Sequence, residues 1–356
     1  MRRAVLHIGL PKTGSTALQG FLSGNRATLA RHGLRWPESI FGPNHLVVPA
    51  AFTVRRERLT ASVGVTNDRD QRRARERLRK RLDAELAHGT TVILSSEQMS
   101  THLRSADEVR ALADFMHEVA DRVDVVGVLR RADYWLPSSY AEAVMGGQTR
   151  PQNGAFVQSR RHLLDHDALL DRWTTAFGPQ SCHLLPFVET DKTDPMALPR
   201  RFLATVGVSA SNSPGWTTPA TLTRTSINAR GTELLRALNP QISHAGLRPG
   251  RDRQRLFAAM ATRFPGAGST LTPSAAKALE GAGWIWTGID QRAHDATDDW
   301  SRWAAYELAE CRPAPPITHS EAAALLAELR DEGVIRRREW AGAAALRRWT
   351  LRALHR

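Results

Sequence analysis

The stretch HIGLPKTGST, His7–Thr16, stands between a short apolar run and a helical pattern. The run Ala4–Gly9 predicts a buried strand, and the apolar spacing over Ser15–Ala30 predicts a helix. Glycine lets a backbone approach a ligand closely, and the free amide groups at a helix start attract negative charge. The stretch therefore predicts a strand–loop–helix unit that holds a phosphate or sulfate group.

The order of residues in this loop differs from the common nucleotide-binding pattern G-x-x-x-x-G-K-[ST]. In PKTGST, Pro11–Thr16, the lysine precedes the glycine. Lys12 can reach an oxygen of the anion, Gly14 permits close approach, and Ser15 and Thr16 offer hydroxyl groups and helix-start amides. An ordinary glycine-containing turn is the plain alternative.

Further buried strands are predicted at Thr90–Glu97, Val123–Arg130 and Cys182–Glu189. The segments between them have helical patterns, at Arg69–Leu86, Ala106–Ala120 and Ala132–Met145. Strands that alternate with helices indicate a parallel sheet covered on both faces. We expect an α/β, P-loop-like three-layer fold with a central, mainly parallel sheet.

The strand patterns stop after about Ser209, and helical and Pro/Gly-rich segments follow. The length of 356 residues allows one large domain or a domain with an appendage. We expect a core over residues 1–210 and a mostly helical C-terminal extension over 211–356, which packs on the core and could carry acceptor-site and oligomer contacts.

The chain is strongly basic, with a formal net charge of +13. Only four of its 49 basic residues are lysine. The excess of positive charge therefore reflects a general preference of this sequence for arginine as much as a function. The charge favours anionic ligands, whether a nucleotide, a sulfated or phosphorylated substrate, nucleic acid or an acidic membrane. No interleaving of basic and aromatic residues and no zinc-ligand spacing favours nucleic acid.

Cysteine and hydropathy patterns suggest the compartment. Cys182 and Cys311 are far apart and form no disulfide framework or metal cluster, which favours a reducing cytosol. The first apolar run is too short for a signal peptide, and no run of eighteen apolar residues is present. We therefore expect a cytoplasmic protein with no membrane-spanning segment.

At the loop the sequence resembles a known family. LPKTGSTALQ, Leu10–Gln19, is similar to the 5′-phosphosulfate loop of sulfotransferases that use 3′-phosphoadenosine 5′-phosphosulfate (PAPS), and Gln19 resembles the bacterial branch. The resemblance implies that Lys12, Thr13, Gly14, Ser15 and Thr16 bind the 5′-phosphosulfate.

A second motif of this family binds the 3′-phosphate with an arginine at a strand end and a serine eight residues later. In VVGVLRRADYWLPSSY, Arg130 and Ser138 have this spacing, and Arg131 and Ser139 form a second pair. Tyr140 matches a bacterial Ser-x-Tyr pattern and favours Arg130 with Ser138. A surface arginine pair with a capping serine is the plain alternative.

The family places its catalytic base after the strand between these motifs. Here that position holds Glu97, and an acidic group at a strand end faces the ligand in open α/β sheets. His45, in GPNHL, is the rival, since the bacterial branch often has Asn-His there and histidine titrates near neutral pH. Gln19 could contact donor or acceptor. The plain alternatives are a helix-capping glutamate and a structural histidine.

The resemblance covers about residues 4–240 and implies sulfuryl transfer from PAPS to a hydroxyl or amine of a small molecule, glycan or natural product. The products would be the sulfated acceptor and adenosine 3′,5′-bisphosphate, and the scheme requires no metal. The Arg-Lys-Gly-like loop that many members add to the 3′-phosphate site is not found; Arg224, Arg230 and Arg248–Arg253 are basic candidates.

Other functions stay open for this sequence. A P-loop kinase or nucleoside triphosphatase shares the phosphate loop, although the lysine order and the lack of a strand-end aspartate speak against it. A non-catalytic anion- or nucleic-acid-binding protein rests on charge alone. A degenerate sulfotransferase fold that acts only as a scaffold is disfavoured by the intact Lys12, Arg130 and Ser138.

The last third of the chain holds two further features. Trp284–Trp303 is rich in tryptophan and could line an acceptor site or pack in a core. Val334–Arg356 predicts a basic amphipathic helix that could dock on the domain, pair subunits as a homodimer, or contact a membrane surface or an acidic partner.

Overall fold

The computed structural model describes residues 1–38, 44–87, 89–188, 190–209, 215–218, 226–244, 251–266, 268–284, 300, 303 and 309–335. The chain forms two compact units. The first contains Met1–Arg131, Arg160–Leu222 and Trp286–Glu307, and the second contains Ala132–Ser159, Thr223–Ile285 and Leu308–Arg356. The segment Ala132–Ser159 of the second unit thus lies, in the sequence, between two segments of the first unit.

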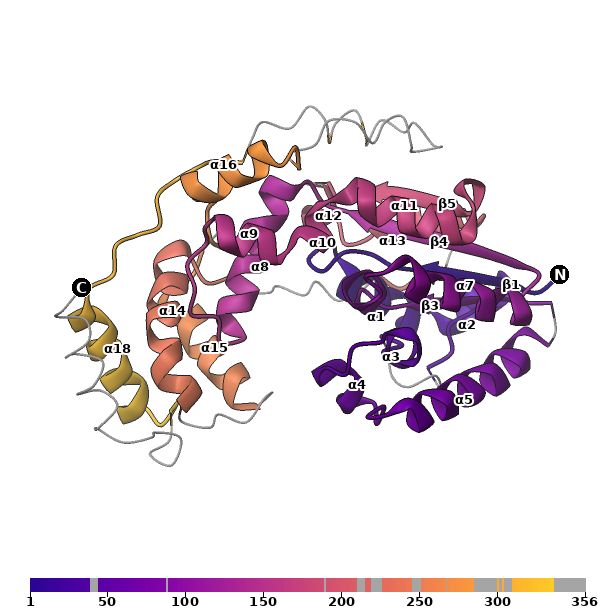
Figure 1. The fold of residues 1–356 in the computed structure, drawn as a ribbon, viewed down its shortest axis with the longest axis horizontal. Helices are drawn as coiled ribbons and strands as arrows, with labels where there is room; N and C mark the ends of the chain where they lie inside the picture. Colours follow the sequence, from indigo (N-terminus) through magenta and orange to yellow (C-terminus); the bar gives the residue numbers. More distant parts are fainter. Residues whose placement is uncertain are drawn as a thin grey trace. The chain divides into compact units, whose positions relative to one another are not determined.

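Five parallel strands form the sheet of the first unit, in the order β2-β3-β1-β4-β5. Figure 1 labels β1, β3, β4 and β5. They are β1 (Arg3–His7), β2 (Leu34–Arg35), β3 (Thr91–Ser95), β4 (Arg122–Leu129) and β5 (Cys182–Pro186). The parallel sheet confirms the predicted α/β fold. The two-residue β2 is too short to leave a pattern of alternating or continuous apolar residues, so the sequence does not predict it.

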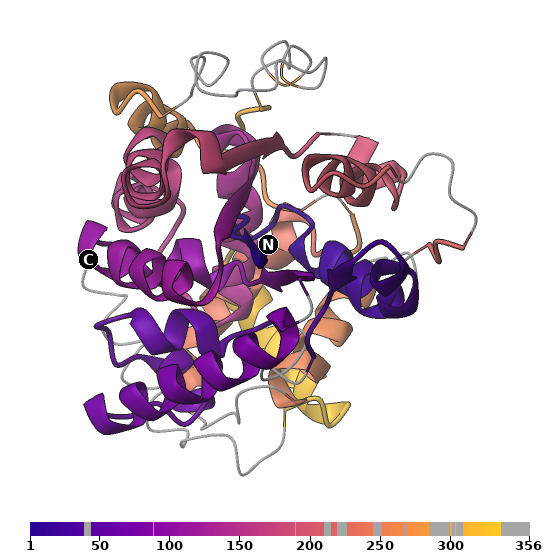
Figure 2. The ribbon, with the colours of Figure 1, turned by 90° about the vertical axis from the view of Figure 1, so that its right-hand side faces the viewer.

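Helices cover both faces of this sheet (Figure 2). The helices of the first unit are α1 (Ser15–Gly24), α2 (Arg26–Arg31), α3 (Val47–Phe52), α4 (Arg58–Ser62), α5 (Asp68–Leu86), α6 (Gln98–His102), α7 (Ala106–Val119), α10 (Arg161–Leu164), α11 (His166–Phe177), the 3₁₀ turn η1 (Pro179–Ser181), α12 (Thr190–Thr193) and α13 (Ala197–Thr205). Residues of α1, α2 and α13 share one apolar cluster with Val5, Ile93 and Val126 of the sheet. On the opposite face, α5 contacts β3, and α7 and α11 contact β4.

The segment predicted as one helix over Ser15–Ala30 is divided into α1 and α2 at Asn25. The Asn25 side-chain amide donates to the carbonyl oxygens of Phe21 and Thr217, at 2.8 Å each, and its oxygen accepts from the amide of Thr217 at 2.7 Å. The two bonds to Thr217, which is 192 residues away, outweigh the local helical pattern.

The second unit is helical in its described part, apart from the isolated bridges Ile227–Pro265 and Leu271–Cys311. Its helices are α8 (Ala132–Met145), α9 (Gly154–Ser159), α14 (Ala229–His244), α15 (Arg251–Arg263), α16 (Pro273–Gly281) and α18 (His319–Asp331). The buried Asn239 of α14 donates to the carbonyl oxygens of Val144, at 2.7 Å, and Gln148, at 2.8 Å. Arg253 of α15 donates to the Asn239 side chain at 2.9 Å, so one amide joins three segments.

Two sequence predictions fall mainly outside the described residues. Of the tryptophan-rich stretch, Trp300 and Trp303 are buried, with their rings edge to face at 5.1 Å. This packing agrees with a core role for these two residues. Most of the basic tail, residues 336–356, lies outside. In the part of the chain that the structure describes, no helix is both long enough and apolar enough to cross a bilayer.

Candidate functional site

The predicted site residues of the first unit follow three neighbouring strands. The loop at residues 9–16, which we call the phosphate loop after its predicted role, follows β1. Glu97 follows β3, and Arg130 follows β4. β1 lies between β3 and β4 and is parallel to both, with His7 paired to Ser95 and Val126. The chain builds the sheet on the β3 side of β1 first and crosses later to β4, on the other side of β1. The carboxyl ends of these strands are therefore at a topological switch point, which is where open α/β sheets bind ligands.

The phosphate loop has a constrained backbone. Lys12 and Gly14 both adopt positive φ angles, 67° and 78°. Such an angle is unusual for lysine and indicates that the surroundings hold the turn. The Thr13 hydroxyl donates to the Leu10 carbonyl at 2.5 Å, and the amide of Leu10 donates to Val128 of β4 at 3.0 Å. The loop is therefore fastened to the sheet.

Gly14 lies where a larger residue would not fit. A Cβ atom there would stand 3.0 Å from the Leu198 side chain and 3.1 Å from the Phe187 ring, in addition to the strain of the positive φ. Gly14 precedes α1 and, having no side chain, leaves the amides of the first helical turn uncapped. These amides are the groups that bind an anion at a helix start.

Ser15, the first residue of α1, supplies a second sign of an anion site. Its side chain is 2% exposed. Its hydroxyl has no hydrogen-bond partner among the residues that the structure describes. A buried hydroxyl beside helix-start amides fits an oxyanion, which would accept from both. The loop residues thus suit a phosphate or phosphosulfate group.

Arg130 contacts the loop directly. Its Nη1 donates to the carbonyl oxygen of Lys12 at 3.3 Å, and its guanidinium lies 5.5 Å from the centroid of the Phe187 ring. The structure therefore brings together the strand-end arginine and the lysine loop, which are 118 residues apart in the sequence.

The neighbouring Arg131 is 4% exposed, and its Nη1 lies 3.4 Å from the carbonyl oxygen of Trp303. Ser138 and Ser139 are on α8, which belongs to the second unit. Ser139 is buried, whereas Ser138 is partly exposed. The Tyr140 hydroxyl donates to Glu233 at 2.6 Å, and burial together with this carboxylate raises the pKa of Tyr140.

Glu97 is the residue before α6, and its side chain is partly exposed. Ser100 ties this position to the phosphate loop, because its hydroxyl lies 2.9 Å from the carbonyl oxygen of Glu97 and 3.1 Å from that of Gly9. One side chain therefore fixes the base candidate relative to the loop.

His45 is fully buried, and its backbone φ is 39°. The Ser95 amide donates to Nδ1 at 2.9 Å, so Nε2 carries the proton and donates to the Pro37 carbonyl at 3.2 Å. Burial lowers the pKa of His45 to about 4, against small opposing effects of Pro37 and Glu38. Both ring nitrogens are engaged, so His45 fixes the end of β3 rather than presenting a free nitrogen.

The sequence reasoning gives no role to His7, the last residue of β1, or to Ser95. His7 Nδ1 lies 2.7 Å from the Ser95 hydroxyl, to which Gln19 donates at 3.1 Å. His7 Nε2 is buried and has no partner among the described residues, and burial lowers the pKa of His7 to about 4. Polar residues at the ends of two buried strands are the signal that could have found this pair.

The other basic candidates belong to the second unit or lie outside the described residues. Arg230 forms an ion pair with Glu321 within the second unit. Arg224 and residues 245–250 lie outside the described part of the chain, and Arg251 and Arg253 are on α15 of the second unit. Among the described residues, no group of three or more His, Cys, Asp or Glu side chains could hold a metal ion.

Comparisons with known proteins find structural likeness only. No family model matches, and no curated protein matches. Among solved structures, a sulfotransferase from Alicyclobacillus acidocaldarius is 15% identical with a TM-score of 0.42, covering 85% of this chain and 100% of its own. The sulfotransferase domain of the Synechococcus PCC 7002 olefin synthase is 14% identical with a TM-score of 0.34, covering 58% of this chain and 74% of that one.

A third chain, the sulfotransferase domain from the curacin biosynthetic pathway, is 12% identical with a TM-score of 0.33, covering 59% of this chain and 75% of its own. Likeness at this level does not assign the chain to a family. The function is therefore argued from the residues of the site.

Proposed function

We propose that the protein is a sulfotransferase that moves the sulfuryl group of PAPS to a hydroxyl or amine of a small-molecule, glycan or natural-product acceptor. The observation that carries the proposal is the bond from Arg130 to the carbonyl of Lys12, because it brings the loop proposed for the 5′-phosphosulfate into contact with the arginine proposed for the 3′-phosphate. The uncapped start of α1 and the unpartnered hydroxyl of Ser15 support an anion in the loop.

In this proposal PAPS supplies a sulfuryl group joined to a good leaving group. The amides of Thr13 to Thr16 hold the 5′-phosphate, and Lys12 stabilises the negative charge that grows on the bridging oxygen as the S–O bond breaks. Arg130, with the Ser138 hydroxyl, holds the 3′-phosphate. The charge that develops resembles that of phosphoryl transfer, where positioning and electrostatics dominate.

Glu97 is the proposed base. Its carboxylate takes the proton of the acceptor hydroxyl or amine as the new bond to sulfur forms, and the released product is adenosine 3′,5′-bisphosphate. The bonded nitrogens of His45 favour a positioning role for it, through the end of β3 that precedes Glu97. Comparing turnover of Glu97→Gln and His45→Ala tests this division once an acceptor is known.

The direct test is a calorimetric titration with adenosine 3′,5′-bisphosphate in the absence of Mg²⁺. We expect a Kd of about 1–10 µM for the wild type. Lys12→Ala should weaken binding by about 10–100-fold, since one charge-assisted hydrogen bond is lost. Lys80→Ala, on the surface helix α5, is the matched control and should bind like the wild type.

Absence of binding by the wild type would exclude the sulfotransferase proposal. Turnover of ATP that requires Mg²⁺ would instead identify a P-loop kinase or triphosphatase. Salt-sensitive binding to DNA without preference for PAPS would indicate a non-catalytic nucleic-acid-binding protein.

A further inference from the structure

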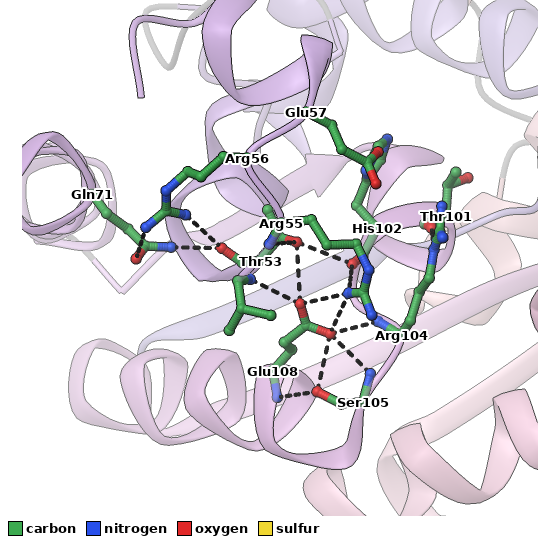
Figure 3. A network of polar contacts seen from close by, with 11 residues as sticks. Thr53, Arg55, Arg56, Glu57, Gln71, Thr101, His102, Arg104, Ser105 and Glu108 are labelled. Atoms are coloured by element: carbon green, nitrogen blue, oxygen red, sulfur yellow. Dashed lines mark hydrogen bonds and ion pairs between the residues drawn. The ribbon is translucent and has the colours of Figure 1, made fainter. Parts of the chain in front are cut away.

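A second group of basic side chains lies in the first unit. One of them, Arg104, follows the C-terminal end of α6, whereas Glu97 precedes the N-terminal end. We name Arg55, Arg104, His162 and Arg172 the arginine cluster. They come from the segment after α3, the turn before α7, and helices α10 and α11. Figure 3 shows the Arg55 guanidinium beside the carboxylate of Glu108. The backbone amide of Arg104 also donates to this carboxylate, whereas the Arg104 side chain donates to the carbonyl oxygen of Thr101. Burial first, and then the positive charges of Arg104, Arg160, Arg172 and Arg55, lower the pKa of His162 to about 3.

The carboxylates of Glu108 and Asp165, near this cluster, already accept hydrogen bonds, and Glu108 accepts some of them from Arg55 of the cluster itself. Glu108 accepts from Arg55 Nη1, at 2.8 and 3.0 Å, and from the backbone amides of Val54, Arg104 and Ser105. Asp165 caps α11 by accepting from the amide of Ala168. Among the described residues, neither carboxylate accepts a hydrogen bond from Nε or Nη2 of Arg172.

Arg172 has buried donors that are not satisfied. Its Nε and Nη2 atoms, and Nε2 of His162, are buried and have no hydrogen-bond partner among the described residues. Nε and Nη2 lie on the same edge of the guanidinium, which presents two parallel N–H groups to a carboxylate, sulfate or phosphate. Arginine stays protonated, so these N–H groups require an acceptor.

We propose that the arginine cluster is a second oxyanion site, distinct from the phosphate loop, with the Nε/Nη2 edge of Arg172 as its fork. Its ligand is an oxyanion group: phosphate, sulfate or carboxylate. The side chains of the cluster are each partly exposed, although Nε and Nη2 of Arg172 are themselves buried.

The probe is inorganic phosphate, and the readout is the Tm of the full chain in 50 mM sodium phosphate against NaCl of equal ionic strength. Adenosine 3′,5′-bisphosphate is present throughout to fill the phosphate loop. For a phosphate Kd near 1 mM, we expect the wild-type Tm to rise by about 3–6 °C. Arg172→Met should lose most of this rise, whereas Lys12→Ala should keep it.

The control is Arg110→Met, because Arg110 is an exposed arginine of α7 that pairs with Asp107. It should show the wild-type rise. A full rise in Arg172→Met, or loss of the rise in Lys12→Ala, would overturn the proposal. If Arg172→Met does not fold, Arg172→Lys keeps the charge without the fork, and an unchanged rise in it would also overturn the proposal.

This site does not depend on the proposed function. The Tm rise caused by adenosine 3′,5′-bisphosphate alone reports the phosphate loop, whereas the additional rise caused by phosphate reports the arginine cluster. Either effect can therefore fail without the other.

Discussion

Gly9 shows how closely the phosphate loop is packed on its own strand. A Cβ atom at Gly9 would stand 2.8 Å from Nε2 of His7 and 3.2 Å from the hydroxyl of Ser15. His7 is fully buried and bonded to Ser95, so it has little room to move. His7 Nε2 and Ser15 Oγ, which have no hydrogen-bond partner among the described residues, thus both border the small space around Gly9.

We expect Gly9→Ala to lower the free energy of unfolding by about 1–3 kcal/mol, because the added methyl group overpacks this space. Binding of adenosine 3′,5′-bisphosphate should weaken as well, since Ser15 is displaced. Urea unfolding and calorimetry measure the two effects.

Gly20→Ala is the control for this change. Gly20 lies on α1, and no heavy atom lies within 4 Å of its added Cβ. Alanine is the better helix former, so stability should rise by about 0.5–1 kcal/mol. A Gly9→Ala protein as stable as the wild type would refute the packing described here.

At the scale of elements, Glu108 fastens the start of α7 to the segment after α3. It forms a capping box with Ser105 and also accepts from the amide of Val54 and from Arg55 (Figure 3). Burial by itself raises the pKa of Glu108, but hydrogen bonds from Val54, Ser105 and Arg55 outweigh it and lower the pKa from 4.5 to about 2.

The lowered pKa makes this carboxylate a source of acid sensitivity. A carboxyl group with a depressed folded-state pKa stabilises the protein above its unfolded pKa, and this stabilisation is lost as the pH falls through the folded value. Glu108 should therefore contribute about 3 kcal/mol at pH 7, and the contribution should decline between about pH 4.5 and pH 2.

We expect Glu108→Gln to unfold with a free energy about 2–4 kcal/mol lower at pH 7, because the partly buried Arg55 loses its charge partner. The difference from the wild type should shrink as the pH falls toward 3. Denaturant unfolding at several pH values measures both. Glu118→Gln, an exposed position on the same helix, should show neither effect, and a pH-independent difference for Glu108→Gln would contradict the assignment.

At the scale of the whole molecule, the chain is divided between two units that are not consecutive in sequence. The segment Ala132–Ser159 leaves the first unit directly after β4 and joins helices from the last third of the chain. The division predicted at residue 210, between a PAPS-binding core and an extension, stays a prediction.

Asn239 offers a test of the second unit. It is fully buried and bonded to Val144, Gln148 and Arg253. We expect Asn239→Ala to cost about 2–4 kcal/mol, because several buried polar groups lose their partner. Hydrogen exchange should accelerate in α8, α14 and α15, while β1, β3 and β4 keep their protection.

Arg255→Ala, at an exposed position of α15, is the control and should leave exchange unchanged. An equal acceleration in both units after Asn239→Ala would show that the two unfold as one body. Hydrogen exchange of Asn239→Ala therefore also tests whether the chain forms the two separate units.

Much of the fold could be predicted from the sequence alone. Buried parallel strands read as continuous apolar runs, and surface helices carry a regular apolar stripe, so β1, β3, β4, β5 and α5 were predictable within a few residues. Lys12, Gly14 and Arg130 could be selected because the local chemistry of an anion loop and of a strand end is visible in residue order.

Only the tertiary structure decided which side chains meet. Several contacts join residues that are far apart along the chain: Arg130 with Lys12, the ring of His45 with the Ser95 amide, and His7 with Ser95. The arginine cluster also draws on distant segments. The break at Asn25 likewise depends on Thr217. The physical reason is that residue type and spacing determine local conformation and the buried face, whereas hydrogen bonds between distant segments depend on how the elements pack.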